Sequence, residues 1–262
     1  MQTWDPSDYE RHSAVQESWA RDCIARLHLG GAERILDIGC GDGRVSAELA
    51  ARVPAGSVLA VDASAEMVAH ARAKHLDEAG GNLAFAVADA AGLSYEHVFD
   101  LVVSFSCLHW VQDQAAVLNG IARALVDDGR MFLHFGGCGN VAGFLSTVNE
   151  VTARHVWQAA FVDFGVPWCF PEAATFRGLV EDAGLHPDRI ELLSRKMPYE
   201  DAAALAGFVR TIWFPYLDRL PDELRGAFID EVVVAYLEAH PSDRHGRIWV
   251  DAVRIEAEGH RL

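Results

Sequence analysis

Short apolar runs alternate with helical patterns along the first half of the chain, and this alternation restricts the fold more than any other feature. The apolar runs are Arg34–Ile38, Val58–Val61, Leu83–Ala88, Asp100–Phe105 and Arg130–Phe135. The fourth run, DLVVSF, is almost continuously apolar, as a strand buried on both faces requires. Strand and helix units that alternate in this way predict a parallel sheet with helices on both faces.

The helices between these strands are placed by apolar spacing and by end signals. The first helical pattern is Arg44–Ala51. Ser64 is predicted to be the N-cap of the second, because a serine oxygen accepts a hydrogen bond from the first turn. Behind it, apolar positions recur at Met67, Val68, Ala71 and His75. A third helix carries apolar residues up to Leu125, and we expect Gly129 to end it.

The second half is richer in aromatic residues and in helical patterns. Pro171 opens a helix that runs to about Ala183 and stops at Gly184, because proline suits a first helical turn. Two more strands are predicted, and two helical patterns lie between them. In chain order these four elements are Arg189–Ser194, Asp201–Phe214, Pro221–Ala239 and Arg247–Glu256.

We expect a single domain over residues 1–262. At about 150 residues per domain, this length allows one large domain or two small ones. No repeat, low-complexity tract or linker divides the chain. The aromatic, helical segments at about 137–170 and 197–242 are therefore predicted to be insertions that form a cap.

Composition argues against several classes of partner. The net charge of −16 disfavours nucleic acid and anionic membranes. The five cysteines are far apart and form no CxxC pair, so neither a disulfide framework nor a metal site is predicted. No 18 apolar residues run together, and the polar N-terminus is unlike a signal peptide. A cytoplasmic location is therefore expected, and the oligomeric state is left open.

The segment Ile35–Gly43 (ILDIGCGDG) ends the first predicted strand and opens the first helix. Its three glycines let the backbone turn sharply and let a ligand approach closely. Asp62 ends the second strand, where doubly wound folds place an acid that binds ribose hydroxyls. A dinucleotide site needs GxGxxG, but this register is GxGxG and Arg44 occupies the position of the third glycine. Asp37 would repel a pyrophosphate and suits an ammonium group.

These residues favour S-adenosylmethionine, which has an ammonium group, a sulfonium and a ribose, over a nicotinamide cofactor. On them the chain resembles the class I S-adenosylmethionine-dependent methyltransferases, well over residues 9–195 and loosely beyond. LDIGCGDG is similar to their motif I, Val61–Ser64 (VDAS) to their ribose site, and Ala88–Ala90 (ADA) to their adenine site. Ser104–Val111 (SFSCLHWV) is similar to the motif after their fourth strand.

The resemblance implies an α/β fold, a doubly wound, seven-stranded Rossmann-like sheet whose last strand is antiparallel. It also implies S-adenosylmethionine as cofactor and S-adenosylhomocysteine as product. The cofactor-binding residues that follow are Asp37, Gly39, Gly41, Asp62, Ala63, Met67, Asp89, Ala90 and Ser104.

A narrower resemblance concerns the acceptor. Tyr9, Ser13, Gln16 and Trp19, with the run LHWV at 108–111, are similar to the juvenile-hormone-acid, trans-aconitate and malonyl-carrier-protein methyltransferases, which methylate carboxylates. This implies acceptor-site roles for Gln16 and Trp110, beside His109. Other methyltransferases of natural-product metabolism share these motifs, so a phenol, amine or carbon acceptor stays open, as does a cofactor-binding protein without catalysis.

The predicted cap offers residues for an acceptor with an apolar body. Arg210 suits a bidentate clamp on a carboxylate. Trp157, Trp213 and Tyr216 are expected to line an apolar substrate chamber, although such aromatic residues more often pack a core. A carboxylate has a pKa near ~4 and needs no base. A phenol or alcohol would need one, and His109 is then the candidate.

Overall fold

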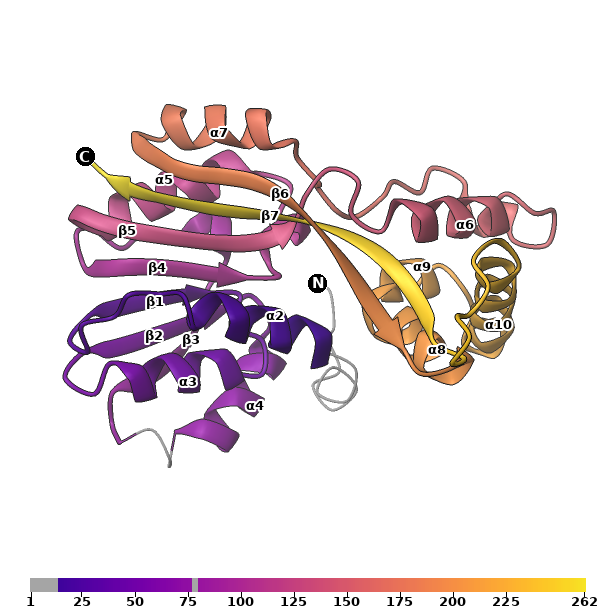
Figure 1. Cartoon of the computed structure of the whole chain (residues 1–262), viewed down its shortest axis with the longest axis horizontal. Helices are drawn as coiled ribbons and strands as arrows, with labels where there is room; N and C mark the ends of the chain where they lie inside the picture. Colours follow the sequence, from indigo (N-terminus) through magenta and orange to yellow (C-terminus); the bar gives the residue numbers. More distant parts are fainter. Residues whose placement is uncertain (1–13, 77–79) are drawn as a thin grey trace. The chain divides into compact units, whose positions relative to one another are not determined.

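The structure is a computed structural model, and it describes residues 14–76 and 80–262. Tyr9 and Ser13 of the N-terminal pattern lie outside the described residues. The chain divides into two compact units (Figure 1). The first contains the residues up to Cys138 together with Trp168–Leu193 and Arg254–Leu262. The second contains Gly139–Pro167 and Ser194–Val253. The cap role of the aromatic, helical segments stays a prediction.

A seven-stranded sheet organises the chain, in the order β3-β2-β1-β4-β5-β7-β6. The pairs among β1 to β5 are parallel, and β7 is antiparallel to β5 (Figure 1). This topology confirms the fold class predicted from the sequence. The strands are β1 (Arg34–Ile38), β2 (Ser57–Asp62), β3 (Leu83–Val87), β4 (Phe99–Phe105), β5 (Leu125–Gly136), β6 (Leu185–Tyr199) and β7 (Ile248–Arg261).

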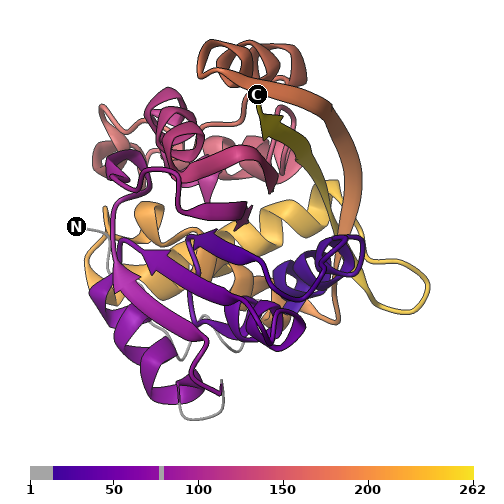
Figure 2. The same cartoon turned by 90° about the vertical axis from the view of Figure 1, so that its left-hand side faces the viewer.

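Helices cover both faces of the sheet in the first unit (Figure 2). One buried cluster joins the sheet to α2, α3 and α4, and another joins it to α5 and α7. Both faces of the strands are therefore apolar, which explains their near-continuous apolar runs. The elements are α2 (Ala14–Ile24), α3 (Arg44–Arg52), α4 (Ala65–His75), α5 (Gln114–Ala124), α7 (Ala173–Asp182), and the short 3₁₀ turns η1 (Ala90–Gly92) and η2 (Leu108–Trp110).

Two local predictions have opposite outcomes. Ser64 caps α4 as predicted, since its oxygen accepts a hydrogen bond from the Met67 N–H at 3.2 Å. The prediction that Gly129 ends the helix before β5 is wrong. That helix ends at Ala124, and Leu125 already pairs with Phe99 of β4. Gly129 instead lies within β5, where the pairing register with β4 shifts.

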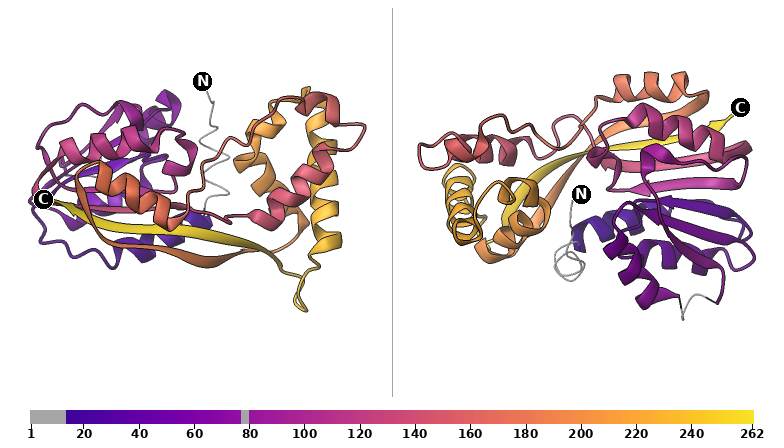
Figure 3. Two further views of the ribbon diagram at one scale, coloured as in Figure 1. Left: turned by 90° about the horizontal axis from the view of Figure 1, so that it is seen from above. Right: turned by 180° about the vertical axis from the view of Figure 1, so that it is seen from behind.

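The second unit is built on an aromatic core. Its elements are α6 (Ala142–Thr152), η3 (Gln158–Phe161), α8 (Ala202–Ile212), α9 (Phe214–Leu217) and α10 (Asp222–Ala239). Helix α10 packs on α6 and α8 (Figure 3). Phe144 of α6 lies at the centre of this core, with ring-centroid distances of 4.9 Å to both Trp213 and Tyr236. Among the described helices, none is long and apolar enough to cross a membrane.

Candidate active site

The loop between β1 and α3 has a backbone that only glycine adopts easily. Gly39, Gly41 and Gly43 have φ angles of 77°, 54° and 82°. A Cβ atom on Gly39 would lie 2.3 Å from Sγ of Cys107, so this position has no room for a side chain. The N–H of Gly39 donates to the Val61 carbonyl at 2.7 Å, which ties the loop to the end of β2. The loop is thus a fixed cradle at the carboxyl edge of the sheet.

Two carboxylates flank this loop. Asp37 is 1% exposed, and its Oδ2 accepts a hydrogen bond from Oγ of Ser46 at 2.6 Å. Burial, reinforced by the charge of Asp62, raises the pKa of Asp37 to about 7. Asp62 accepts hydrogen bonds from the N–H groups of Gly41 and Ser64, both at 2.9 Å, and burial raises its pKa. A cationic ligand group would favour the charged forms of both acids.

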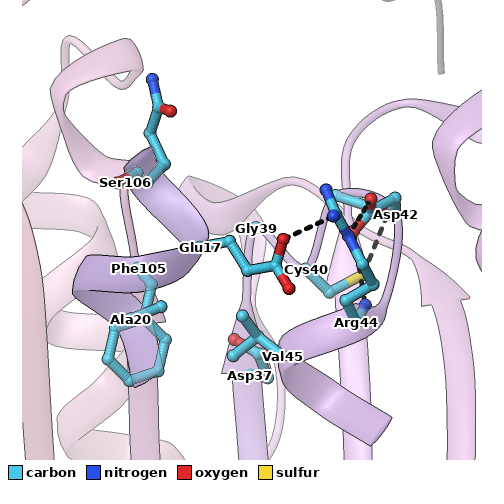
Figure 4. A pocket seen from close by; sticks show the side chains of 12 residues that line it. Glu17, Ala20, Asp37, Gly39, Cys40, Asp42, Arg44, Val45, Phe105 and Ser106 are labelled. Carbon is cyan, nitrogen blue, oxygen red and sulfur yellow. Dashed lines mark hydrogen bonds and ion pairs between the residues drawn. The ribbon is translucent and has the colours of Figure 1, made fainter. Parts of the chain in front are cut away.

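A pocket opens beside the loop (Figure 4). It is lined by residues of α2, the glycine loop, the start of α3 and the end of β4: Gln16, Glu17, Ala20, Asp37, Gly39, Cys40, Gly41, Asp42, Arg44, Val45, Phe105 and Ser106. Arg44 donates to Glu17 at 2.5 Å and to Asp42 at 2.6 Å, so an ion pair joins α2 to α3 across one wall. Asp37, Gly39, Gly41 and Gln16 are the predicted site residues that line this pocket.

The other predicted cofactor residues lie elsewhere at the strand ends. Asp89 is exposed and caps η1, since its Oδ1 accepts from the Ala91 N–H at 2.9 Å. Met67 and Ala90 are buried, and Ala63 is exposed. Ser104 is fully buried and donates to the Ile38 carbonyl at 2.8 Å, which joins β4 to β1. Their contacts with a cofactor stay predictions.

Three acids at the ends of β1, β2 and β3 influence one buried thiol. Burial, followed by the charges of Asp62, Asp37 and Asp89, raises the pKa of the Cys107 thiol. The three carboxylates that the sequence assigns to the cofactor therefore all act electrostatically on the Cys107 thiol, which follows β4.

His109 and Trp110 lie on η2, directly after β4. His109 is buried, its ring lies 5.9 Å from that of Phe170, and its Nδ1 accepts a hydrogen bond from the Gly136 N–H at 3.4 Å. Burial and the nearby charges of Arg254 and His134 hold the pKa of His109 well below its usual value. The imidazole is therefore neutral at pH 7, with its proton on Nε2. Trp110 is half-buried, and its ring meets that of Trp168 edge-on at 5.5 Å.

Gln16 lies on α2 and contributes a polar group to the pocket. Its Oε1 atom is buried and accepts no hydrogen bond from any residue that the structure describes. Trp19, one turn further along α2, is 8% exposed. Because they are three residues apart in the helix, Gln16 and Trp19 lie on the same side of α2.

The predicted substrate residues of the cap lie in the second unit. Trp157, Trp213 and Tyr216 are 4%, 1% and 2% exposed and belong to the aromatic core. The indole N–H of Trp157 donates to Glu231 at 2.6 Å. Arg210 lies exposed on α8. The aromatic residues thus pack a core, and a contact with substrate stays a prediction for all four.

A buried cluster that no sequence pattern marks joins α2, β5 and β7. Ligand atoms of Cys23, His134 and Glu256 lie within 4.8 Å of one another. Burial raises the pKa of Glu256, but hydrogen bonds from Arg26 and Arg189 outweigh it and lower that pKa to about 2. We assign no metal here, because two guanidinium groups already neutralise the carboxylate. Sequence spacing gives no signal for a cluster assembled by tertiary contacts.

Comparison with known proteins agrees with this geometry. A family model described as a methyltransferase domain matches residues 35–129. Trans-aconitate 2-methyltransferase of Methylobacterium radiotolerans is 31% identical over 252 residues, which cover 94% of either chain. The enzyme of that name from Streptomyces coelicolor is 30% identical over 271 residues, 98% of this chain and 88% of that one.

Solved structures share the fold at lower identity. The YcgJ protein of Bacillus subtilis aligns with a TM-score of 0.63 and 17% identity, covering 94% of this chain and 98% of its own. Phosphoethanolamine N-methyltransferase 2 of Haemonchus contortus, solved in complex with S-adenosyl-L-methionine, aligns with a TM-score of 0.62 and 16% identity. That alignment covers 98% of this chain and 57% of the other.

Proposed function

Since the chain belongs to the class I S-adenosylmethionine-dependent methyltransferases, we propose that it transfers the methyl group to a carboxylate oxygen of a small molecule. The enzyme class and the methyl donor follow from the family, and the product of the donor is S-adenosylhomocysteine. The proposal concerns the acceptor and the residues that act on it.

The residues of the pocket fit the cofactor. Gly39 and Gly41 line the pocket and carry no side chain, so a ligand can lie against the backbone of the loop. Asp37 would bind the ammonium group, and Asp62 would bind the ribose hydroxyls. When bound, S-adenosylmethionine supplies an electrophilic methyl group on a sulfonium.

The hydrogen bonding and the low basicity of His109 are the observations that favour a carboxylate acceptor. Its Nδ1 lone pair accepts the Gly136 N–H, and its pKa is held well below the usual value by burial, then by Arg254 and His134. A weakly basic imidazole with an occupied acceptor atom is poorly suited to take a proton from a phenol or an ammonium group. A carboxylate is already ionised at pH 7 and needs no such step. The site has only to desolvate and align it.

The relatives add independent support. The two curated relatives described above are named trans-aconitate 2-methyltransferases, and they match this chain along nearly its whole length. A small polycarboxylate is therefore the first acceptor class to test. Gln16, His109 and Trp110 are the proposed acceptor-side residues. Arg210, Trp157, Trp213 and Tyr216 of the predicted cap are proposed to bind the body of the acceptor.

The unbridged cysteines support a reducing compartment as the location of the enzyme. Cys23, Cys40, Cys107, Cys138 and Cys169 are all unbridged. Unbridged cysteines are typical of reducing compartments, and the proposal therefore places the enzyme in the cytoplasm.

The test uses S-adenosylmethionine with a labelled methyl group and three matched acceptor sets. The first set holds small di- and tricarboxylates, including trans-aconitate. The second holds their amides, and the third holds phenols and primary amines. We expect label only in the carboxylates, as esters that mild alkali converts back to the acid and methanol. Label in an amine or phenol, with the acids untouched, would assign the alternative acceptor class.

A further inference from the structure

An arginine is buried at the carboxyl edge of the sheet. Arg254 lies on β7 opposite Gly136, the last residue of β5, and is 4% exposed. Its Nη2 donates a hydrogen bond to Oγ of Ser106 at 2.8 Å, and its Cζ lies 5.3 Å from the ring centroid of Trp19. Arginine is among the residues least often buried, because its charge loses the hydration of bulk water. A buried arginine here, in a chain with a net charge of −16, is therefore a candidate functional group.

Ser106 connects this arginine to the pocket. It follows β4 directly and has a φ angle of 57°, a left-handed conformation that is uncommon outside glycine. Its N–H donates to the His134 carbonyl at 2.7 Å, which helps to fix the backbone. Such strained residues gather at functional sites. Ser106 also lines the pocket beside the glycine loop (Figure 4).

The hydrogen-bond direction at Ser106 matters for what the pocket can bind. The guanidinium has donors only, so Oγ of Ser106 must accept this bond. The hydroxyl hydrogen of Ser106 is then available for a different acceptor atom. A ligand oxygen in the pocket can take that hydrogen bond.

Most of the charged side chains that line the pocket are acidic. Asp37, Asp42 and Glu17 line it, and Arg44 is held between the last two of these acids. An anionic ligand group would meet this negative wall. The charge of Arg254 acts from beside Ser106, and it also contributes to the lowered pKa of His109 after burial.

We propose that Ser106 and Arg254 form a carboxylate-binding pair at the end of β4. Ser106 donates its hydroxyl hydrogen to a ligand carboxylate oxygen, and Arg254 is a positioning residue that orients the hydroxyl and supplies positive charge. Two carboxylates can meet the pair, that of the acceptor and that of the methionine part of the cofactor. Binding of the acceptor carboxylate rests on the proposed function, whereas binding of the cofactor carboxylate does not.

The test compares Ser106→Ala, Arg254→Lys and Arg254→Gln with Arg261→Gln as a matched control. Arg261 lies on the same strand and donates to the Ala122 and Leu125 carbonyls, so its loss makes the same charge change away from the pocket. Calorimetry measures Kd for S-adenosylhomocysteine, and for trans-aconitate with S-adenosylhomocysteine already bound. Steady-state kinetics separates KM from kcat, and thermal unfolding checks that each variant is folded.

We expect Ser106→Ala to weaken binding of one carboxylate ligand about tenfold, and Arg254→Gln about ten- to hundredfold, with Arg254→Lys recovering part of the loss. Loss confined to trans-aconitate assigns the pair to the acceptor, and KM should then rise with kcat little changed. Loss confined to S-adenosylhomocysteine assigns it to the cofactor. Methylthioadenosine, which lacks the carboxylate, and the trimethyl ester of trans-aconitate should bind all variants equally.

The pair is overturned if Ser106→Ala and Arg254→Lys bind both carboxylate ligands as the parent does. It is also overturned if the uncharged ligands lose affinity as much as the acids do. If Arg254→Gln does not fold, Ser106→Ala and Arg254→Lys still test whether the pair binds a carboxylate. If the parent enzyme methylates no acid, the proposed function fails, whereas the binding of S-adenosylhomocysteine still tests the pair.

Discussion

Asp37 is a carboxylate buried in the wall of the pocket, and burial raises its pKa to about 7. Its charge therefore changes within the ordinary working range of pH. In the proposed binding mode the ammonium group of the cofactor binds the ionised form of Asp37, so affinity should fall as pH drops below about 7. We expect Kd for S-adenosylhomocysteine to rise by up to about tenfold per pH unit there. Calorimetry from about pH 8 to about pH 6 checks this.

Asp37→Asn separates this carboxylate from the other titrating groups. The amide oxygen can still accept the hydrogen bond from Ser46, so the local fold should persist. The variant should bind S-adenosylhomocysteine about ten- to hundredfold more weakly at pH 8, with a flat pH profile. A variant that keeps the slope of the parent would place the titrating group elsewhere.

The burial of Asp37 also makes the stability of the unliganded protein depend on pH. The pKa is raised from 3.8 to about 7, so the folded state binds the proton more tightly than the unfolded state. The stability that this gives is complete below about pH 4 and is lost as pH rises through about 7. Without ligand, Asp37→Asn should therefore raise Tm at pH 8 more than at pH 5. Asp113→Asn, the matched change at the N-cap of α5, should leave Tm nearly unchanged, since asparagine also caps. Equal Tm shifts at both pH values would contradict the assignment.

At the scale of elements, the glycine loop is joined to α2 by one ion-paired network. Arg44 of α3 binds Glu17 of α2, and Glu17 also binds Arg21. The side chains of Arg44 and Glu17 are 22% and 15% exposed, so solvent screens this pair less than a surface pair. The network fixes one wall of the pocket.

Glu17→Gln should loosen α2 more than it lowers global stability. We expect a loss of about 1 kcal/mol in the free energy of unfolding and faster amide hydrogen exchange along α2. Glu48→Gln is the matched control, because Glu48 forms more exposed pairs with Arg21 and Arg52. Its effect should stay below about 0.5 kcal/mol. Identical exchange in the two variants would show that the Arg44 pair does not hold α2.

Local sequence patterns predicted the positions of the helices and strands better than they predicted where each one begins and ends. Apolar runs place β1 to β4 nearly to the residue, and the Ser64 cap places α4. The early start of β5 was missed because it depends on pairing with β4, where the register shifts after Phe99. Periodicity within one segment carries no information about such a partner.

In the candidate site, too, residues within one motif could be predicted, whereas a residue placed by strand pairing could not. Asp37, Gly39 and Gly41 lie within one motif, so sequence alone brings them to the pocket. Arg254 depends on the antiparallel register that sets it opposite Gly136. With 20 arginines in the chain, no local signal marks this one. The predicted role of Arg210 as a carboxylate clamp stays a prediction.

At the scale of the whole molecule, the net charge of −16 acts oppositely on the cofactor and on the proposed polycarboxylate acceptor. S-adenosylmethionine carries a net positive charge and is attracted at long range, whereas a polycarboxylate is repelled. Raising the ionic strength from about 10 mM to about 150 mM shortens the screening length from about 30 Å to about 8 Å. The kcat/KM for the cofactor should therefore fall, and that for a polycarboxylate should rise, each by up to about tenfold.

Two controls separate this long-range effect from local contacts. Sodium chloride and potassium chloride at equal ionic strength should give the same slopes, because screening does not depend on the monovalent cation. A monocarboxylate acceptor should show a smaller rise than a tricarboxylate, since the repulsion scales with ligand charge. If kcat/KM for a tricarboxylate falls with salt as steeply as that for the cofactor, local attraction outweighs the net charge. The acceptor would then be guided by a cationic region rather than opposed by the molecule as a whole.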